Sequence, residues 1–440
     1  MSTTDALTLN ELLSKSLGDW IALPTSANIA ANTIVRAEGL NQHDGGRDDY
    51  FTDWWLYITD KGNAGVDRRI RNYYTSNTTC NVFGAAFSAD AAVNANIRVH
   101  RYSFSQKQIA INTAIKDIYP ILHRRLDLLE LRSGDILPNS HFRDWAVSTV
   151  PDKWALRNNI LVTANTSGGH YWGGSKSAGL NPGSIAEPSL YTSAVEYPRL
   201  LDLEGQSITF QAHARADVAQ NAFIRIYACN VTNAIQTIQQ NISLVAGLWN
   251  IARLADQTLF SNLTNIEFHV GIVNVSGDHV WFDNVRVTGL QTQEYLLPTD
   301  FRHGGLSRVY IQSDGDCNTI FPRAWDEIIG WQVMDDGTDK YLRLPAVYSN
   351  DRYLRLVGVA PLETVSASAD TISLGAPDTD LLIALAKYKL YQMAGEPASA
   401  HDDARFMTKE AKAYMEYQQL LPRLRMGIPS RVMQIPPVRG

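Results

Sequence analysis

The stretch WFDNVRVTGL, residues 281–290, decides the fold class of the middle of this chain. A bulky aromatic residue and an Asp-Asn pair precede apolar side chains at alternate positions, Val285 and Val287. This pattern predicts a β-strand with a bend at its head. Strands of this kind usually close an antiparallel β-sandwich, yet 150 residues follow this one. The sandwich is therefore expected to be one part of a longer architecture.

The surrounding block, residues 138–290, is expected to supply the rest of the sandwich. SITFQAHARA, AFIRIYAC and IEFHVGIVNV alternate apolar and polar residues, with turn signals between them and no helix of any length. Tyr171 and Trp172 lie in the Gly/Ser-rich loop SGGHYWGGSKSAG, residues 167–179, and are the aromatic side chains most expected to be exposed. They are candidates for stacking on sugar rings; the alternative is that the large aromatic residues fill the sandwich core.

The segment before the sandwich, residues 1–137, combines helices with a small β-domain. A short amphipathic helix is predicted at 8–17, and short alternating strands separated by turn residues follow between Trp20 and Tyr102. A long helix is predicted over 106–131, with Pro120 kinking or restarting it. Its apolar residues are spaced by three or four: Ile111, Ile115, Ile118, Leu122, Leu126 and Leu129.

The segment after the sandwich, residues 291–422, begins with short strands and ends with two helices at 378–395 and 401–424. The last part, RLRMGIPSRVMQIPPVRG at 423–440, has four arginines, three prolines and no acidic residue, so an extended arm is predicted. Positions 404–440 hold seven Lys/Arg and two Glu, a net charge of +5 in a chain of net charge −6. The arm is expected either to dock on an acidic partner or to be a disordered tail. The residues assigned to docking are Arg423, Arg425, Arg431 and Arg439.

Together these segments predict an α+β fold: a helical core with a small N-terminal β-domain and an inserted antiparallel β-sandwich. Charged residues at 19% and hydrophobic residues at 45% are ordinary for a folded protein, and the negative net charge argues against nucleic-acid recognition. The three cysteines, Cys80, Cys229 and Cys317, are too few and too widely spaced for a disulfide framework, so free thiols are expected. No signal-peptide pattern and no apolar run of membrane-spanning length is found, so no membrane partner is expected. No catalytic motif is found either, and the chain is not expected to be an enzyme.

Three segments of the middle block resemble the jelly roll of carbohydrate-binding modules: NSHFRDW at 139–145, LEGQSITFQAHARA at 203–216 and VWFDNVRV at 280–287. The resemblance implies a structural calcium ion, held by Asp283 together with Asn139. Arg143 occupies the position where the opening segment of that family usually has an acidic residue. No other cofactor is expected.

The flanking parts resemble head-to-tail adaptor (connector) proteins of tailed bacteriophages. The matching segments are VHRYSFSQKQIAINTAIKDIYPIL at 99–122, RYLRLVGVAPL at 352–362 and DTDLLIALAKYKLYQMAG at 378–395. The resemblance implies a homo-dodecameric ring that joins the portal protein to tail or nozzle proteins, with DNA passing through its channel without sequence recognition. The arm arginines would then contact the portal. The chain would be assembled in the host bacterial cytoplasm and reside at the head-tail junction of the virion.

Two other functions remain open from the sequence. The first is a glycan-binding tail or capsid-decoration protein that uses the jelly roll for attachment to the host. The second is a polysaccharide-active enzyme with an appended binding module, for which no acid/base pair can be assigned.

Overall fold

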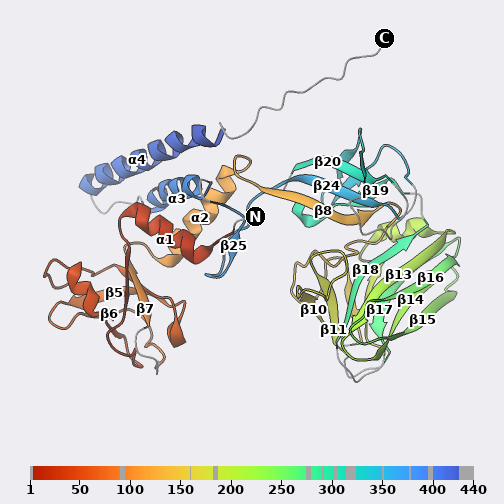
Figure 1. The fold of residues 1–440 in the computed structure, drawn as a ribbon, viewed down its shortest axis with the longest axis horizontal. Helices are drawn as coiled ribbons and strands as arrows, with labels where there is room; N and C mark the ends of the chain where they lie inside the picture. The colour runs from red at the N-terminus through yellow and green to blue at the C-terminus, as the bar shows by residue number, and fades with distance from the viewer. Residues whose placement is uncertain are drawn as a thin grey trace, which may run out of the picture. The chain divides into compact units, whose positions relative to one another are not determined.

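The computed structural model divides the chain into two compact units. Unit 1 consists of Met1–Arg124 and Pro361–Gly440, and unit 2 is Arg125–Ala360. Unit 2 is therefore an insertion in unit 1, as the colours along the chain show in Figure 1. The structure describes residues 3–425 except 90–94, 159, 182–186, 274–278, 290–291, 302–304, 314–323, 349–350, 376–377 and 395–399.

Helices from both ends of the sequence share one hydrophobic core in unit 1. They are α1 (Ala6–Leu17), α2 (Phe104–Ile118), α3 (Asp378–Ala394) and α4 (Ala400–Arg425). Leu9, Ile111 and Leu382 belong to that core and are fully buried. α1 begins at Asp5, whose carboxylate accepts the N–H of Thr8 at 2.6 Å. Helices from the two ends of the chain thus pack together in unit 1.

The predicted long helix over 106–131 is wrong beyond residue 118. α2 ends at Ile118, and the chain enters strand β8 (Arg124–Arg132). In β8 the side chains of Leu126 and Leu128 are buried while Asp127 is exposed, which is the two-residue period of a strand. β8 is an edge strand of the sheet β21-β20-β24-β8 in unit 2. The apolar spacing fitted a helix as well, and only this non-local pairing decides between the two.

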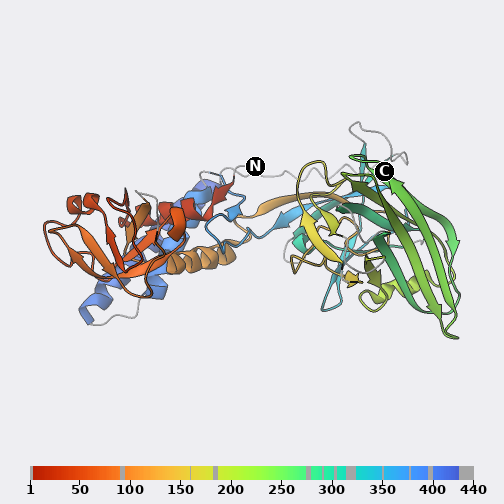
Figure 2. The same ribbon diagram turned by 90° about the horizontal axis from the view of Figure 1, so that it is seen from below.

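The small β-domain of unit 1 is a six-stranded sheet between α1 and α2 in sequence. Its core includes Phe51 and Tyr73, whose rings meet edge to face at 4.9 Å. In both views the four helices of unit 1 cluster together (Figures 1 and 2). In sheet order the strands are β2 (Ile21–Pro24), β7 (Asn96–His100), β4 (Trp55–Ile58), β5 (Asp67–Tyr74), β6 (Thr79–Val82) and β3 (Ile34–Arg36). A further two-stranded sheet pairs β1 (Thr4–Asp5) with β25 (Thr371–Ile372).

The sandwich predicted from WFDNVRV is confirmed as two five-stranded antiparallel sheets, whose long strands run side by side in Figure 2. Phe210 of the first sheet and Phe268 of the second meet edge to face in its core at 5.1 Å. The first sheet contains β10 (Leu161–Asn165), β11 (Ser177–Asn181), β18 (Val280–Thr288), β13 (Ser207–Ala216) and β16 (Asn250–Thr258). The second sheet contains β15 (Ile235–Leu244), β14 (Gln220–Asn230), β17 (Leu263–Ile272), β12 (Ser189–Ser193) and β9 (Ala155–Arg157).

Two smaller sheets complete unit 2, so the unit extends beyond the predicted boundaries 137/138 and 290/291. Val309 and Leu354 are fully buried in their shared core. The strands are β19 (Glu294–Leu296), β23 (Lys340–Arg343) and β22 (Gln332–Asp335) in one sheet. In the other, β8 is joined by β21 (Trp325–Glu327), β20 (Gly305–Gln312) and β24 (Tyr353–Ala360). Short 3-10 helices lie at Glu38–Gln42, Lys61–Asn63, Pro198–Leu203 and Thr299–Phe301.

The described part of the chain is therefore mainly β-structure, with helices concentrated in unit 1. Among the described residues, no helix has the length and apolar character needed to cross a membrane. Cys80 is a buried free thiol and Cys229 a partly buried one, while Cys317 lies outside the described residues.

Candidate functional site

The outward side of the second sheet carries a row of polar and aromatic side chains, which we call the polar face. On β14, Ile224 and Ile226 are fully buried in the core, so the alternating Arg225 and Tyr227 point outward. The polar face is made of Tyr191, Arg225, Tyr227, Gln239, Glu267 and His269.

The strand register aligns these side chains across four strands. Arg225 is opposite Gln239 of β15 on one side and opposite His269 of β17 on the other. His269 is in turn opposite Tyr191 of β12. Residues directly opposite one another on adjacent strands have Cβ atoms about 5 Å apart, so the row is continuous.

His269 is the best-connected member of the row. The ring of Tyr191 stacks on its imidazole, with centroids 5.0 Å apart and planes 19° apart. His269 Nε2 lies 2.9 Å from Glu267 Oε2, and Nδ1 lies 3.2 Å from the hydroxyl of Ser189. Burial lowers the pKa of His269, and the hydrogen bond from His269 lowers the pKa of Glu267. A neutral imidazole that donates to a charged Glu267 carboxylate satisfies both shifts.

Arg225 organises the other half of the row. Its Nε donates to Gln239 Oε1 at 2.6 Å, and its terminal nitrogen pairs with the carboxylate of Glu187. The guanidinium also lies over the ring of Phe223, 4.6 Å from its centroid. Phe223 is fully buried, so its ring helps to hold the guanidinium in place, and the aromatic surface of the polar face comes from the partly exposed Tyr191 and Tyr227. This combination suits a ligand with hydroxyl groups at its rim and an apolar face.

The predicted glycan contacts lie over the first sheet, away from the polar face. Trp172 is 48% exposed, and its ring stacks on His213 of β13 at 4.5 Å and 23°. Tyr171 beside it is partly buried. The loop that carries them is attached to the sandwich because Asp283 Oδ2 accepts the N–H groups of Trp172 at 2.5 Å and Gly173 at 3.2 Å.

The side chains named for calcium, Asp283 and Asn139, do not fit that ion. Asp283 is fully buried, and its Oδ1 accepts the N–H of Asn284 at 2.6 Å and lies 3.1 Å from His141 Nδ1. With the two loop amides on Oδ2, both oxygens are engaged.

Asn139 is engaged as well. Its amide nitrogen donates to the carbonyls of Asp144 and Asp152, and its oxygen accepts the N–H of Asp144. Within the described residues no group of three or more His, Cys, Asp or Glu is arranged to hold a metal ion. The chain's own N–H groups thus surround the carboxylate expected to bind calcium.

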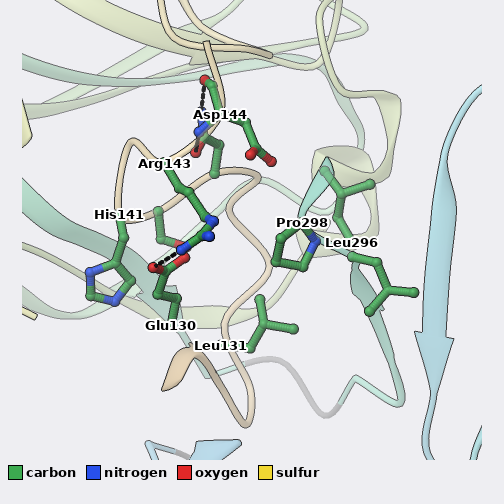
Figure 3. Close-up of a pocket in the computed structure, with 10 residues that line it drawn as sticks. Glu130, Leu131, His141, Arg143, Asp144, Leu296 and Pro298 are labelled. Carbon is green, nitrogen blue, oxygen red and sulfur yellow. Dashed lines mark hydrogen bonds and ion pairs between the residues drawn. The ribbon is translucent and has the colours of Figure 1, made fainter. Parts of the chain in front are cut away.

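A small pocket lies where the opening segment of the sandwich meets the smaller sheets of unit 2. Figure 3 shows the guanidinium of Arg143 directed at Glu130, with Leu296 and Pro298 across the pocket. Arg143 donates to Glu130 at 2.8 Å and also pairs with Asp300. The pocket has a volume of about 30 Å³, which is room for a water molecule but not for a sugar ring. Arg143, noted above for standing where an acidic residue is usual in the family that this block resembles, thus forms structural ion pairs.

The predicted arm lies mostly outside the described residues. Arg423 and Arg425 belong to the last turn of α4, whose backbone is described without their side chains. Arg431 and Arg439 lie outside the described residues. Docking of this arm stays a prediction.

Searches with the sequence matched no protein-family model and no curated protein. The similar solved structures include the C-terminal family 22 carbohydrate-binding module of Clostridium thermocellum Xyn10B. It has a TM-score of 0.29 and 10% identity, over 37% of this chain and 94% of that one. The CBM22-1 xylan-binding domain of Paenibacillus barcinonensis Xyn10C has a TM-score of 0.29 and 8% identity, over 38% and 99%. Tailspike protein 4 of bacteriophage CBA120 has a TM-score of 0.28 and 13% identity, over 36% and 22%.

The polar face was not predicted from the sequence. The signal was present in AFIRIYAC and IEFHVGI, where Arg225, Tyr227, Glu267 and His269 occupy the alternate, outward positions. Which strands pair, and therefore which of these side chains meet, is visible only in the structure.

Proposed function

We propose that this protein binds carbohydrate through the polar face. The observation that carries the proposal is the aligned row from Gln239 through Arg225 and His269 to Tyr191, on four adjacent strands. The partly exposed ring of Tyr191 offers a surface for the C–H-rich face of a sugar, and the partly exposed Gln239, Arg225 and Glu267 offer donors and acceptors for its hydroxyls. His269 is fully buried, and it holds Tyr191 and Glu267 in place without meeting the ligand.

The length and charge of the row indicate the class of glycan. Three inter-strand spacings cover about 14 Å, which suits a short oligosaccharide segment better than a single sugar. Arg225 of the polar face is already paired with Glu187, and the nearby Arg157 is paired with Glu267. A neutral glycan is therefore favoured over an anionic one, because no unpaired cluster of positive charge awaits it.

A glycan array with the full chain, followed by pull-down on insoluble polysaccharides, tests this function. Xylan is a sensible first polysaccharide because similar modules are described as xylan-binding. Wild-type protein should retain one class of neutral glycan, and Tyr191→Ala should retain it markedly less. Tyr74→Ala is the matched control, because Tyr74 is a 43% exposed tyrosine in unit 1. Failure to retain any glycan would overturn the proposal.

A second candidate function is assembly, favoured by the surface of α4. Ala413 and Tyr417 of α4 are buried, and Glu416 pairs with Lys387 of α3 at 2.9 Å. On the rest of the helix Met407 and Met415 are 65% and 59% exposed. With the exposed Ala411 they form an i, i+4, i+8 stripe that has no partner within the described chain.

We infer that this stripe packs against another subunit, as in the phage head-to-tail adaptor that the flanking segments resemble. In that role, unit 1 forms the ring, the C-terminal arm contacts the portal, and the inserted unit 2 carries the glycan-binding sandwich. Analytical ultracentrifugation with and without portal protein tests it, and oligomers are expected with portal. A strict monomer that ignores portal at micromolar concentration would contradict assembly but leave carbohydrate binding standing.

A further inference from the structure

Trp172 and Trp249 form an exposed angle of two indole rings over the first sheet, which we call the tryptophan corner. Their ring centroids are 6.2 Å apart and their planes 69° apart. Trp172 is 48% exposed, and Trp249 is partly buried. An indole normally buries most of its large apolar surface, so a half-exposed one needs an explanation.

The exposed position of Trp172 is held by the fold. The fully buried carboxylate of Asp283 accepts the N–H groups of both Trp172 and Gly173. One face of the indole rests on His213, with ring centroids 4.5 Å apart. Hydrogen bonds from N–H groups to a buried carboxylate are among the stronger ones in proteins, so the ring is fixed rather than free to collapse. The structure thus maintains a flat apolar surface facing solvent.

Polar groups lie near the tryptophan corner on the same side of the first sheet. His170 is two residues before Trp172, and Arg215 is two residues after His213 on β13. His170 Nε2 lies 3.4 Å from Asp217 Oδ1, and Arg215 lies 3.5 Å from the same atom. His170 stacks on Trp281 at 4.2 Å. The charges of Arg215 and Asp217 offset each other. The surroundings therefore suit a neutral ligand with hydroxyl groups.

We propose that the tryptophan corner binds a pyranose ring of a neutral glycan, as a second subsite separate from the polar face. This inference rests on the proposed carbohydrate-binding function. The two sites are separate because the ring of Trp172 stacks on His213 of β13, in the first sheet, whereas the polar face belongs to the second sheet. A sugar has one C–H-rich face for an indole and a rim of hydroxyls for the polar groups beside it.

A protein partner is the other occupant to consider, since Leu248 and Ile251 near the corner are 60% and 57% exposed. Ile251 is opposite His213 in the strand register, so it lies beside the ring that supports Trp172. A sugar is favoured because the corner offers the fixed indole ring of Trp172 beside the ion pair of Arg215 and Asp217, whose charges cancel. A broad apolar area would be expected for a protein partner.

Tryptophan fluorescence separates the two subsites, because none of the residues that define the polar face is a tryptophan. Titration of the full chain with a glycan retained in the array should change the emission of the wild type. Trp172→Ala should lose at least about 80% of that change, and so should Trp249→Ala. Tyr191→Ala should keep the change while losing binding at the polar face. Circular dichroism melts confirm that each variant is folded.

Asp283→Asn provides a second test of the positioning. The apparent affinity that fluorescence titration gives for this variant should be at least about fivefold weaker than that of the wild type. Binding at the polar face, measured by calorimetry, should stay the same. A full response in Trp172→Ala would overturn the corner subsite. So would a silent wild type that binds glycan by calorimetry, which leaves the polar face intact. No binding by either method overturns the proposed function. Self-association that Trp172→Ala abolishes, without a glycan response, assigns the corner to a protein contact instead.

Discussion

The ammonium nitrogen of Lys107 lies 2.7 Å from Nδ1 of His100 in the interior of unit 1. Lys107 is fully buried on α2, and it also donates to the hydroxyl of Ser14 on α1 at 2.5 Å. Burial holds the pKa of His100 well below its ordinary value, so the imidazole accepts this hydrogen bond. Burial also lowers the pKa of Lys107 to about 8. One buried lysine therefore joins two helices and a strand of the small β-domain.

The neighbouring Asp67 makes the stability of unit 1 pH-dependent. Burial raises its pKa to about 6, and its Oδ2 accepts the N–H of Phe104 at 2.7 Å. Its folded pKa exceeds the unfolded value, so folding favours the protonated form. Its contribution to stability is full in acid and is lost as the pH rises through about 6. Chemical denaturation of the wild type and Asp67→Asn should show a stability difference that falls by about 2–3 kcal/mol between roughly pH 4 and 6.5. A pH-independent difference contradicts this assignment.

Arg143 should be important for joining the sandwich to the rest of unit 2. Arg143→Ala leaves the partly buried carboxylates of Glu130 and Asp300 without their shared partner. Loss of one member of such a pair costs about 3 kcal/mol when the group is largely buried. The free energy of unfolding of unit 2, measured in urea, should fall by about that amount. Arg253→Ala, at an exposed position of β16, is the control and should change it by less than about 0.5 kcal/mol. Equal effects of the two variants would refute the role of Arg143.

Gly271 leaves room for the aromatic packing at one end of the polar face. A Cβ at this position would lie 2.5 Å from the ring of Phe223 and 2.6 Å from the carbonyl oxygen of Pro188. Because the backbone oxygen cannot give way easily, Gly271→Ala should destabilise unit 2 by about 2 kcal/mol or more. Gly168→Ala is the matched control, since nothing lies within 4 Å of its Cβ. Thermal melts of the two variants compare them, and a harmless Gly271→Ala would be the contrary result.

Carbohydrate binding at the polar face should depend little on pH near neutrality. The pKa of Glu267 is lowered by its hydrogen bond with His269, and burial lowers the pKa of His269. Both shifts lie on the acid side of the ordinary values, so the pair keeps one charge state near neutral pH. Affinity measured between about pH 6.5 and 8 should vary less than twofold, and it should fall only in acid, as the pair gains a proton. A steep change centred near pH 6.5 would instead indicate that His269 titrates there.

The exposed stripe of α4 should affect assembly without affecting folding. Met415→Glu places a charge on a side chain that is 59% exposed, so the melting temperature of unit 1 should hardly change. Sedimentation in the presence of portal protein should shift toward monomer, because the charge would be buried in the subunit contact. Met334→Glu, at a 36% exposed methionine of unit 2, is the control. Unchanged oligomers in Met415→Glu would remove the stripe from the interface.

Local patterns in the sequence predicted the helices at both ends and the strands of the sandwich. They failed at residues 124–131, where leucines spaced for a helix form β8 because its partner β24 lies more than 200 residues away in sequence. Asp283 was expected to hold calcium, whereas its carboxylate accepts N–H groups of the chain itself. Its role could not be read from spacing, since the loop amides that surround it come from Trp172 and Gly173. The polar face depends on register among four strands, which local periodicity does not specify.

Isothermal titration of the full chain with a neutral oligosaccharide chosen from the array tests carbohydrate binding by the polar face most directly. Tyr191→Ala should weaken the polar-face affinity at least about tenfold, a loss of about 1.4 kcal/mol, while Tyr74→Ala should match the wild type. Equal affinities in all three proteins, or no heat of binding in the wild type, would contradict the account.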